Sequence, residues 1–347
     1  MWIVAFRDLA ARRRRFAIAI AATALVFAIT LLLSGISASI QNEMHRMIRA
    51  FRVDAWVVPA GAAGAFTSTQ AIPAARAAEV AAEPGVTSAA PIVVFRQTTQ
   101  VPKLKDLNMF GYEPGGLGAP PIASGRAVQR DGEIVVDSLL GRRAGESVTV
   151  SDRAFRIVGV THGLSYTAGT PAAFVTLHDA QQILYGGQPL ATTIVTRGIP
   201  QRTPAGLVAQ TNAQAHTDMG RGVRMAASSI QFLSILLWAI AAGIIGAILY
   251  MAALERTQDF AVMKATGASN NFITVALGVQ ALVLAFASGV LALALATALK
   301  PLFPMSVEIA GSAYALLFVV AIVIGLVASV AGLRRAISVD PALAFAG

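Results

Sequence analysis

The sequence has no cysteine and little charge: Asp, Glu, Lys and Arg make up 13% of its 347 residues. The lack of cysteine excludes a disulfide framework and a thiolate metal site, and it is compatible with a domain in an oxidising compartment. The scarcity of charge accompanies 56% hydrophobic residues and a mean hydropathy of +0.66. A chain this apolar belongs to the membrane class of proteins.

Sequence motifs of common catalytic and nucleotide-binding sites are also missing. There is no H-E-x-x-H, no G-x-S-x-G and no Gly-Lys pair from which a phosphate-binding loop is built. The four histidines, His45, His162, His178 and His216, are scattered, and isolated histidines are usually surface or hydrogen-bonded residues. We therefore predict a non-catalytic chain without a metal site or a cofactor of its own.

Four uncharged apolar stretches each reach the roughly 20 residues that a membrane helix needs. They cover residues 16–36, 227–254, 271–299 and 309–333. The first is typical of an uncleaved anchor, although small residues at Ser37 and Ser39 leave signal-peptide cleavage open. No Asp, Glu, Lys, Arg or His lies within the four stretches, which argues against a secondary transporter or a self-contained pump.

Basic residues are distributed unequally between the two sides of these stretches. Nine Lys and Arg residues lie in segments 1–15, 255–270 and 334–347, whereas the loop 300–308 holds only Lys300. The positive-inside bias therefore predicts a multi-pass membrane protein with both termini in the cytoplasm. The same bias accounts for much of the net charge of +9, so we predict contact with membrane lipids and no nucleic-acid binding.

Residues 37–226 read as an extracytoplasmic α+β domain with helical stalks. Ile40, Met44 and Phe51 continue the helical period of the first apolar stretch into a stalk. Turn residues then separate β-rich runs from shorter helical patterns. We predict strands at 53–58, 87–101, 107–112, 133–136, 147–150, 155–160, 172–176 and 192–196, and helices at 74–82, 178–185 and 204–217.

The polar segment 255–270, ERTQDFAVMKATGASN, bridges two of the apolar stretches. As a helix it places Glu255 and Asp259 one turn apart, with Gly267 at a C-terminal cap. The adjoining face carries two apolar side chains within a ring of charge, which suits the docking of another protein. A solvated connector is the alternative. The residues of this adjoining face are Arg256, Phe260, Met263 and Lys264.

The pattern Glu255-Arg256-x-x-Asp259-x-x-x-x-Lys264-Ala265-x-Gly267 resembles the cytoplasmic loop of the MacB/FtsX/LolC/DevC-like ABC transporter permeases. That family usually has Glu where this chain has Asp259. The resemblance implies a coupling helix seated on a separate ATPase, with ATP and Mg²⁺ bound by that partner. Segments 132–137, 145–150, 155–160 and 173–181 are similar, in their order and spacing, to the extracytoplasmic domain of the same family.

The resemblance implies a permease subunit of the bacterial cytoplasmic (inner) membrane that couples ATP hydrolysis to movements of its outer domain, for export or extraction of a lipid, lipoprotein, peptide or drug-like substrate. It pairs with a second copy or a paralogous permease, and a periplasmic or membrane-fusion protein is a further expected partner. Small residues at four-residue spacing, as in Ala239-Gly243-Ala247, Ala281-Ala285-Gly289 and Ala321-Gly325-Ser329, permit close helix packing. Two alternatives stay open: an FtsX-like adaptor that activates a cell-wall hydrolase without transport, and a stand-alone sensor.

Overall fold

The computed structural model describes residues 13–68, 70–101, 103–166, 169–255, 262, 270–303, 307–309 and 311–337. Two compact units divide the chain. Met1–Ser39 and Ala227–Gly347 form one, which we call the helical unit, and Ile40–Ala226 form the other, which we call the sheet domain.

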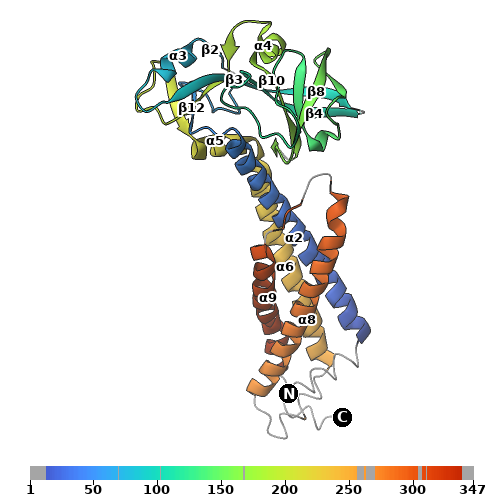
Figure 1. Cartoon of the computed structure of the whole chain (residues 1–347). Coiled ribbons are helices and arrows are strands. Elements are labelled where there is room, and N and C mark those ends of the chain that lie inside the picture. Colours follow the sequence, from blue (N-terminus) through green and yellow to red (C-terminus); the bar gives the residue numbers. More distant parts are fainter. Residues whose placement is uncertain are drawn as a thin grey trace. The chain divides into compact units, whose positions relative to one another are not determined.

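The helical unit contains apolar helices that lie alongside one another (Figure 1). In the described residues, three helical segments are long and apolar enough to cross a membrane: Phe16–Ala50, Ser228–Glu255 and Gly278–Leu302. A shorter apolar segment covers Gly311–Val327. The helices are α2 (Arg13–Ala50), α6 (Arg224–Glu255), α8 (Asn270–Leu299) and α9 (Gly311–Ile337), with the 3₁₀ turn η3 at Lys300–Leu302.

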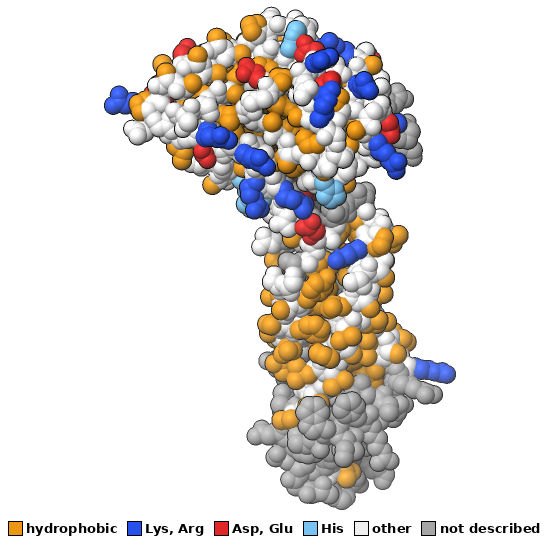
Figure 2. All heavy atoms as spheres, viewed as in Figure 1, with side chains coloured by type: hydrophobic (Ala, Val, Ile, Leu, Met, Phe, Trp, Pro, Cys, Tyr) orange, Lys and Arg blue, Asp and Glu red, His pale blue; other side chains and the backbone are white. Residues whose placement is uncertain are grey.

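Hydrophobic side chains occupy both the core and the surface of the helical unit. Phe27, Leu249, Leu284 and Leu317 bring all four helices into one buried cluster. Hydrophobic side chains also cover most of the visible described surface of this unit, whereas charged side chains gather on the sheet domain (Figure 2). A helix that is apolar on all sides suits a lipid environment.

Small residues bring α8 and α9 together. Ala281, Ala285 and Ala321 are fully buried, and a Cβ added to Gly325 would lie 3.2 Å from the Ala281 carbonyl oxygen. A Cβ at Gly289 would lie 3.0 Å from the Phe318 ring. These two small-residue patterns therefore pack helices within one chain, which is the close approach that such patterns permit.

A short extended segment at 307–309 lies against the small residues of α2. The Glu308 amide donates a hydrogen bond to Ser39 Oγ at 2.7 Å. A Cβ at Gly35 would approach Val307 Cγ1 to 2.7 Å, so a side chain there would displace the segment. Gly35 and Ser39 of α2 therefore contact this segment. The helix α2 continues through Ser37 and Ser39.

The sheet domain is α+β, as predicted. Its main sheet has the order β13-β1-β12-β3-β4-β10-β6-β8-β5, with β7 pairing β3 and β8, and β9 pairing β10; β11 and β2 form a separate pair. The strands are β1 (Ala55–Pro59), β2 (Ile72–Pro73), β3 (Ser88–Val101), β4 (Lys103–Tyr112), β5 (Ser124–Gly125), β6 (Glu133–Asp137), β7 (Ser147–Val150), β8 (Arg153–Thr161), β9 (Ser165–Tyr166), β10 (Thr170–Thr176), β11 (Leu190–Ala191), β12 (Thr193–Arg197) and β13 (Leu207–Thr211). The helices are α3 (Arg76–Ala81), α4 (Leu177–Tyr185) and α5 (Asn212–Met219), with 3₁₀ turns η1 (Ser138–Leu140) and η2 (Gly220–Val223).

Strand β3 joins the two halves of the main sheet. Its residues Ser88 to Ile92 pair with β12, and Val93 to Val101 pair with β4. Most neighbours are antiparallel, but β10 runs parallel to β4 and β6 runs parallel to β8. A single long strand therefore connects the half that contains β1 to the half that contains β10.

Each predicted strand of this domain is present, whereas the helix predicted at 204–217 is wrong in its first half. Leu207 to Thr211 form β13, which pairs antiparallel with β1. The helix begins only after Thr211, whose side chain caps α5 in a reciprocal capping box with Gln214. Residues Leu207 to Thr211 form backbone hydrogen bonds with the edge of β1, which a local sequence pattern does not reveal. This pairing with a distant strand outweighs the helical spacing of apolar residues in the segment.

Candidate functional site

The predicted ATPase-coupling residues lie mostly outside the described part of the chain. Glu255 is the last residue of α6 and is exposed, and α8 begins at Asn270. The other predicted site residues, Arg256, Asp259, Phe260, Met263, Lys264 and Gly267, fall outside the described residues. The coupling role of this segment therefore stays a prediction.

A second candidate site lies in the sheet domain, where the chain leaves α2. Phe51 follows the last residue of α2 and is 2% exposed. Its ring centroid lies 5.1 Å from that of Phe110, 5.2 Å from Trp56 and 6.2 Å from Phe174. Since Trp56 belongs to β1, Phe110 to β4 and Phe174 to β10, the end of α2 packs against both halves of the sheet.

Polar contacts fix the last turns of α2 in the same region. The buried Glu43 accepts a hydrogen bond from the Gly169 amide through Oε2 at 3.1 Å. The rings of His45 on α2 and His216 on α5 stack at a centroid distance of 4.0 Å. The prediction of isolated histidines is therefore wrong for this pair, because the fold brings together helices that are far apart in sequence.

Burial lowers the pKa of His216, and the neighbouring His45 lowers it further, while a hydrogen bond to the Gln41 backbone raises it. His216 Nε2 is buried and has no hydrogen-bond partner among the described residues. Protonation at Nε2 would place a charge beside a second imidazole without a compensating acceptor. This helix contact therefore favours the neutral form of His216.

Asp218, at the end of α5, holds the loop that follows β1. Its carboxylate accepts from the Phe66 amide at 2.9 Å and from the Thr67 hydroxyl. Arg221 Nε lies 3.8 Å from Asp218 Oδ1. Asn212 adds a link at the start of α5, since its side chain accepts from Trp56 Nε1 at 2.8 Å. We call Phe51, Glu43, the histidine pair and Asp218 the stalk junction.

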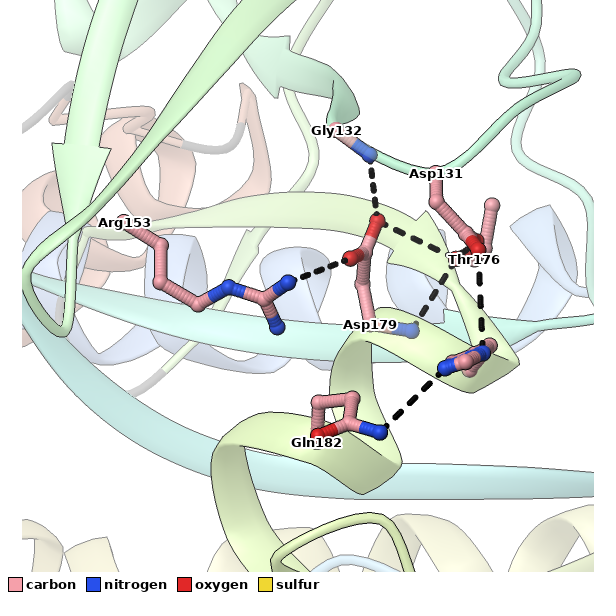
Figure 3. Close-up of polar contacts among 7 residues, drawn as sticks. Asp131, Gly132, Arg153, Thr176, Asp179 and Gln182 are labelled. Carbon is pink, nitrogen blue, oxygen red and sulfur yellow. Dashed lines mark hydrogen bonds and ion pairs between the residues drawn. The ribbon is translucent and has the colours of Figure 1, made fainter.

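Two of the segments that carry the resemblance in this domain, 132–137 and 173–181, meet in a polar cluster at the start of α4 (Figure 3). Thr176 Oγ1 accepts from the Asp179 amide at 3.1 Å and contacts Asp131 Oδ1 at 2.5 Å. Asp179 Oδ2 in turn accepts from the Gly132 amide at 2.7 Å, and Arg153 lies 3.6 Å from Asp179 Oδ1. These side chains cap α4 and tie it to the loop before β6, so their role here is structural.

A cavity of about 390 Å³ opens beside this cluster. Asp131 and Thr176 line it but bind each other, and His178 lies 3.6 Å from Asp131 Oδ2. Asp131, Thr176 and His178 are thus engaged in contacts within the domain.

The sequence-based reasoning did not find the contacts of Glu43, Asp218 or the histidine pair. Their only signal was the presence of ionisable residues on the stalk and on the helix before the second apolar stretch. Glu43 and Gly169 are 126 residues apart in the sequence, and His45 and His216 are 171 apart. No local sequence pattern indicates contacts over such separations.

Comparison with known proteins identifies the family. Residues 16–215 match the model of the MacB-like periplasmic core domain, and residues 231–341 match that of the FtsX-like permease C-terminal domain. Two "Uncharacterized ABC transporter permease" proteins of Mycobacterium tuberculosis (strain ATCC 25618 / H37Rv) are 40% and 39% identical, each over 100% of both chains. The chain belongs to the MacB/FtsX-type family of ABC transporter permeases. The family resemblance of the sequence motifs is thereby confirmed.

Two solved structures align with part of the permease at low identity. The periplasmic region of MacB from Actinobacillus actinomycetemcomitans is 12% identical, with a TM-score of 0.34, covering 48% of the permease and 92% of that chain. The extracellular domain of the transporter YknZ from Gram-positive bacteria is 10% identical, with a TM-score of 0.32, covering 43% and 84%. The family of the permease rests on the sequence matches.

Proposed function

We propose that this permease is the membrane subunit of a bacterial ABC transporter that is driven by a separate ATPase. The chain crosses the cytoplasmic membrane four times with both termini inside, and residues 37–226 and 300–308 lie outside. ATP and Mg²⁺ bind to the ATPase. Two copies of the permease, or the permease and a paralogue, pair to match an ATPase dimer.

The ATPase docks on segment 255–270 in this proposal. Phe260 and Met263 supply apolar anchors, and Glu255, Asp259 and Lys264 surround them with charge that selects the partner. The segment joins α6 directly to α8, so a displacement of the segment moves the ends of two apolar helices.

The observation that carries the proposal is the continuity of α2. It is one helix of 38 residues, about 57 Å long at 1.5 Å per residue. Its first turns carry the apolar stretch, and its last turns belong to the sheet domain, where Phe51 packs against both halves of the sheet. A helix that is continuous from the apolar stretch into a packed cluster offers a route by which a displacement reaches the sheet domain.

The work done by the sheet domain is export or extraction of a lipid, lipoprotein, peptide or drug-like cargo. No Asp, Glu, Lys, Arg or His occurs in the four apolar stretches, so the chain offers no charged path through the membrane for a coupled ion. Energy supplied by an ATPase and delivered as movement of the sheet domain is consistent with that composition.

Charge reversal at Glu255 and Asp259 tests the docking step. We expect the Glu255→Lys/Asp259→Lys double variant to lose the ATPase on co-purification in mild detergent, and Phe260→Asp with Met263→Asp to do the same. Charged pairs at protein interfaces are worth about 1.5–7 kcal/mol when close, so a loss of at least tenfold in retained ATPase is expected.

The matched control is a double reversal on the sheet domain, Glu79→Lys/Glu113→Lys, which changes the net charge equally. The control should retain the ATPase. Full ATPase retention by the Glu255→Lys/Asp259→Lys variant and by the Phe260→Asp/Met263→Asp variant, with unchanged ATP turnover, would contradict docking on segment 255–270. A reporter inserted in that segment and found on the outer face of the cell would contradict the topology.

A further inference from the structure

Five arginines of the sheet domain lie on the segments by which α2 enters this domain and α6 leaves it. Arg46, Arg49 and Arg52 lie in or just after the last turns of α2, and Arg221 and Arg224 lie in η2 and at the start of α6. We call these five residues the arginine border. Figure 2 shows Lys and Arg side chains gathered along the lower border of the domain, where Figure 1 places α5.

The acidic residues of the same segments do not balance this charge at the surface. Glu43 is 2% exposed and Asp218 is 1% exposed, and each accepts a hydrogen bond from a backbone amide. Asp54 is exposed, but its carboxylate accepts from the Gly198 amide at 2.7 Å. The arginines are exposed, apart from the half-buried Arg46. The surface here therefore carries an excess of positive charge.

The exposed arginines keep donors available for an external anion. Among the described residues, none forms a hydrogen bond or an ion pair with the guanidinium of Arg52 or Arg224. Arg49 Nε donates to a carbonyl oxygen of its own helix at 3.2 Å, and Arg221 Nε lies 3.8 Å from Asp218 Oδ1. In the described part of the chain, the Nη atoms of these two arginines have no acceptor.

The start of α6 lies close to the apolar part of the same helix. The segment that is long and apolar enough to cross a membrane begins at Ser228, four residues after Arg224, or about 6 Å along the helix. The headgroup layer is about 5–7 Å thick on each side of the hydrocarbon core. Long arginine side chains also extend toward headgroups along their apolar stems. Arg224, and Arg221 about one turn before it, are therefore within reach of lipid phosphates.

The arginine border departs from the charge bias that the rest of the chain follows. Basic residues are scarce beside the outer ends of membrane helices, and the loop 300–308 has a single lysine. In contrast, all five arginines lie at most 16 residues from the apolar stretches 16–36 and 227–254. This departure indicates that the charges have a local use on that side of the membrane.

We propose that the arginine border binds anionic phospholipids of the outer leaflet, with Arg221 and Arg224 on their phosphates. A guanidinium forms strong paired hydrogen bonds with a phosphate. Each arginine near an anionic membrane surface favours association by about fivefold, whereas the choline of a zwitterionic lipid offsets the charge of its phosphate. Bound lipid anchors the start of α6 at the membrane surface. The identity of the leaflet rests on the topology in the proposed function, and the contact itself does not.

A single fluorophore at the start of α6 tests the contact. The chain has no cysteine, so Ala226→Cys gives one labelling position, and Ala226 is exposed. The labelled full-length permease is reconstituted in phosphatidylcholine nanodiscs that contain spin-labelled phosphatidylglycerol or, at the same mole fraction, spin-labelled phosphatidylcholine. We expect the phosphatidylglycerol to quench the fluorophore with a relative affinity at least about fivefold higher. About 1 M salt should reduce this preference, because the Debye length falls to about 3 Å.

The Arg221→Gln/Arg224→Gln variant should lose most of the preference, and Arg221→Lys/Arg224→Lys should keep most of it. The matched control is Arg143→Gln/Arg156→Gln, which removes two exposed arginines elsewhere in the sheet domain and should behave like the wild type.

Equal quenching by the two lipids in the wild type would overturn the proposal, as would an equal loss of preference in the Gln variant and its control. Loss of the preference in phosphate buffer at matched ionic strength would assign the arginines to free phosphate instead. ATPase co-purification is measured on the same variants, and its retention without a lipid preference would overturn this inference alone.

Discussion

Replacement of Phe51 by alanine should destabilise the sheet domain by about 4–5 kcal/mol. Truncation of a buried phenylalanine costs about 3–5 kcal/mol, and edge-to-face ring pairs add about 0.5–1.5 kcal/mol each beyond their burial. The Phe51 side chain is 2% exposed and contacts the rings of Trp56, Phe110 and Phe174, with Phe66 at 6.3 Å. The several ring contacts place the cost in the upper part of the range.

Trp56 fluorescence measures this effect directly. The chain has three tryptophans, so a Trp2→Phe/Trp238→Phe background leaves Trp56 as the only emitter. Its ring centroid lies 5.2 Å from that of Phe51. For a domain of about 150–250 residues, each kcal/mol lowers Tm by about 2–4 °C, so Phe51→Ala should lower the midpoint by about 8–20 °C. It should also change the Trp56 emission before unfolding begins.

Phe155→Ala is the matched control. Phe155 is 1% exposed in the aliphatic cluster around Val93 and Ile157, and no other aromatic ring contacts it among the described residues. We expect a loss of about 3–4 kcal/mol with unchanged Trp56 emission in the folded state. Equal losses of stability in the two variants, with unchanged Trp56 emission in both, would refute a special role for the Phe51 ring contacts.

Three further predictions concern polar and small residues. Asp218→Ala should lower the free energy of unfolding of the sheet domain by about 2–3 kcal/mol, because buried donors lose a charged acceptor, as denaturant titration will show. The pKa of His216 is lowered in the folded state, so the stability it contributes is complete above its unfolded pKa of about 6.5 and declines as pH falls toward the lowered value. Thermal unfolding between pH 7.5 and 5 should show this decline. The His216→Gln variant has no imidazole to protonate at this position, so its stability should decline less over the same pH range. Gly35→Val should displace Val307 and speed amide hydrogen exchange at 307–309, measured by mass spectrometry.

Each of these predictions has a control elsewhere in the chain. Asp106→Ala removes an exposed carboxylate and should cost less than about 1 kcal/mol. Thr217→Val, at an exposed position of α5 next to His216, removes no titratable group and should leave the pH dependence of unfolding as it is in the wild type. Gly278→Val adds the same side chain to a helical glycine with no atom within 4 Å of the added Cβ, and exchange at 307–309 should not change. Equal effects in a variant and its control would contradict the corresponding contact.

The strands and the apolar helices were largely predictable from local patterns. Alternating or continuous apolar runs bounded by turn residues located each predicted strand, because side-chain periodicity acts within a few residues. The segment 204–217 was the exception, since Leu207 to Thr211 gain their hydrogen bonds from the edge of β1. The prediction failed where a distant strand supplied what the local segment lacked.

By itself, the sequence determined that this protein has apolar helices and an α+β domain, and its motifs led to the permease family. Those properties depend on composition, period and order along the chain. Only the tertiary structure decided that Phe51 packs against both halves of the sheet and that His45 stacks on His216. Such contacts depend on which strands pair and how helices pack, because they join side chains whose separation along the chain carries no local signal.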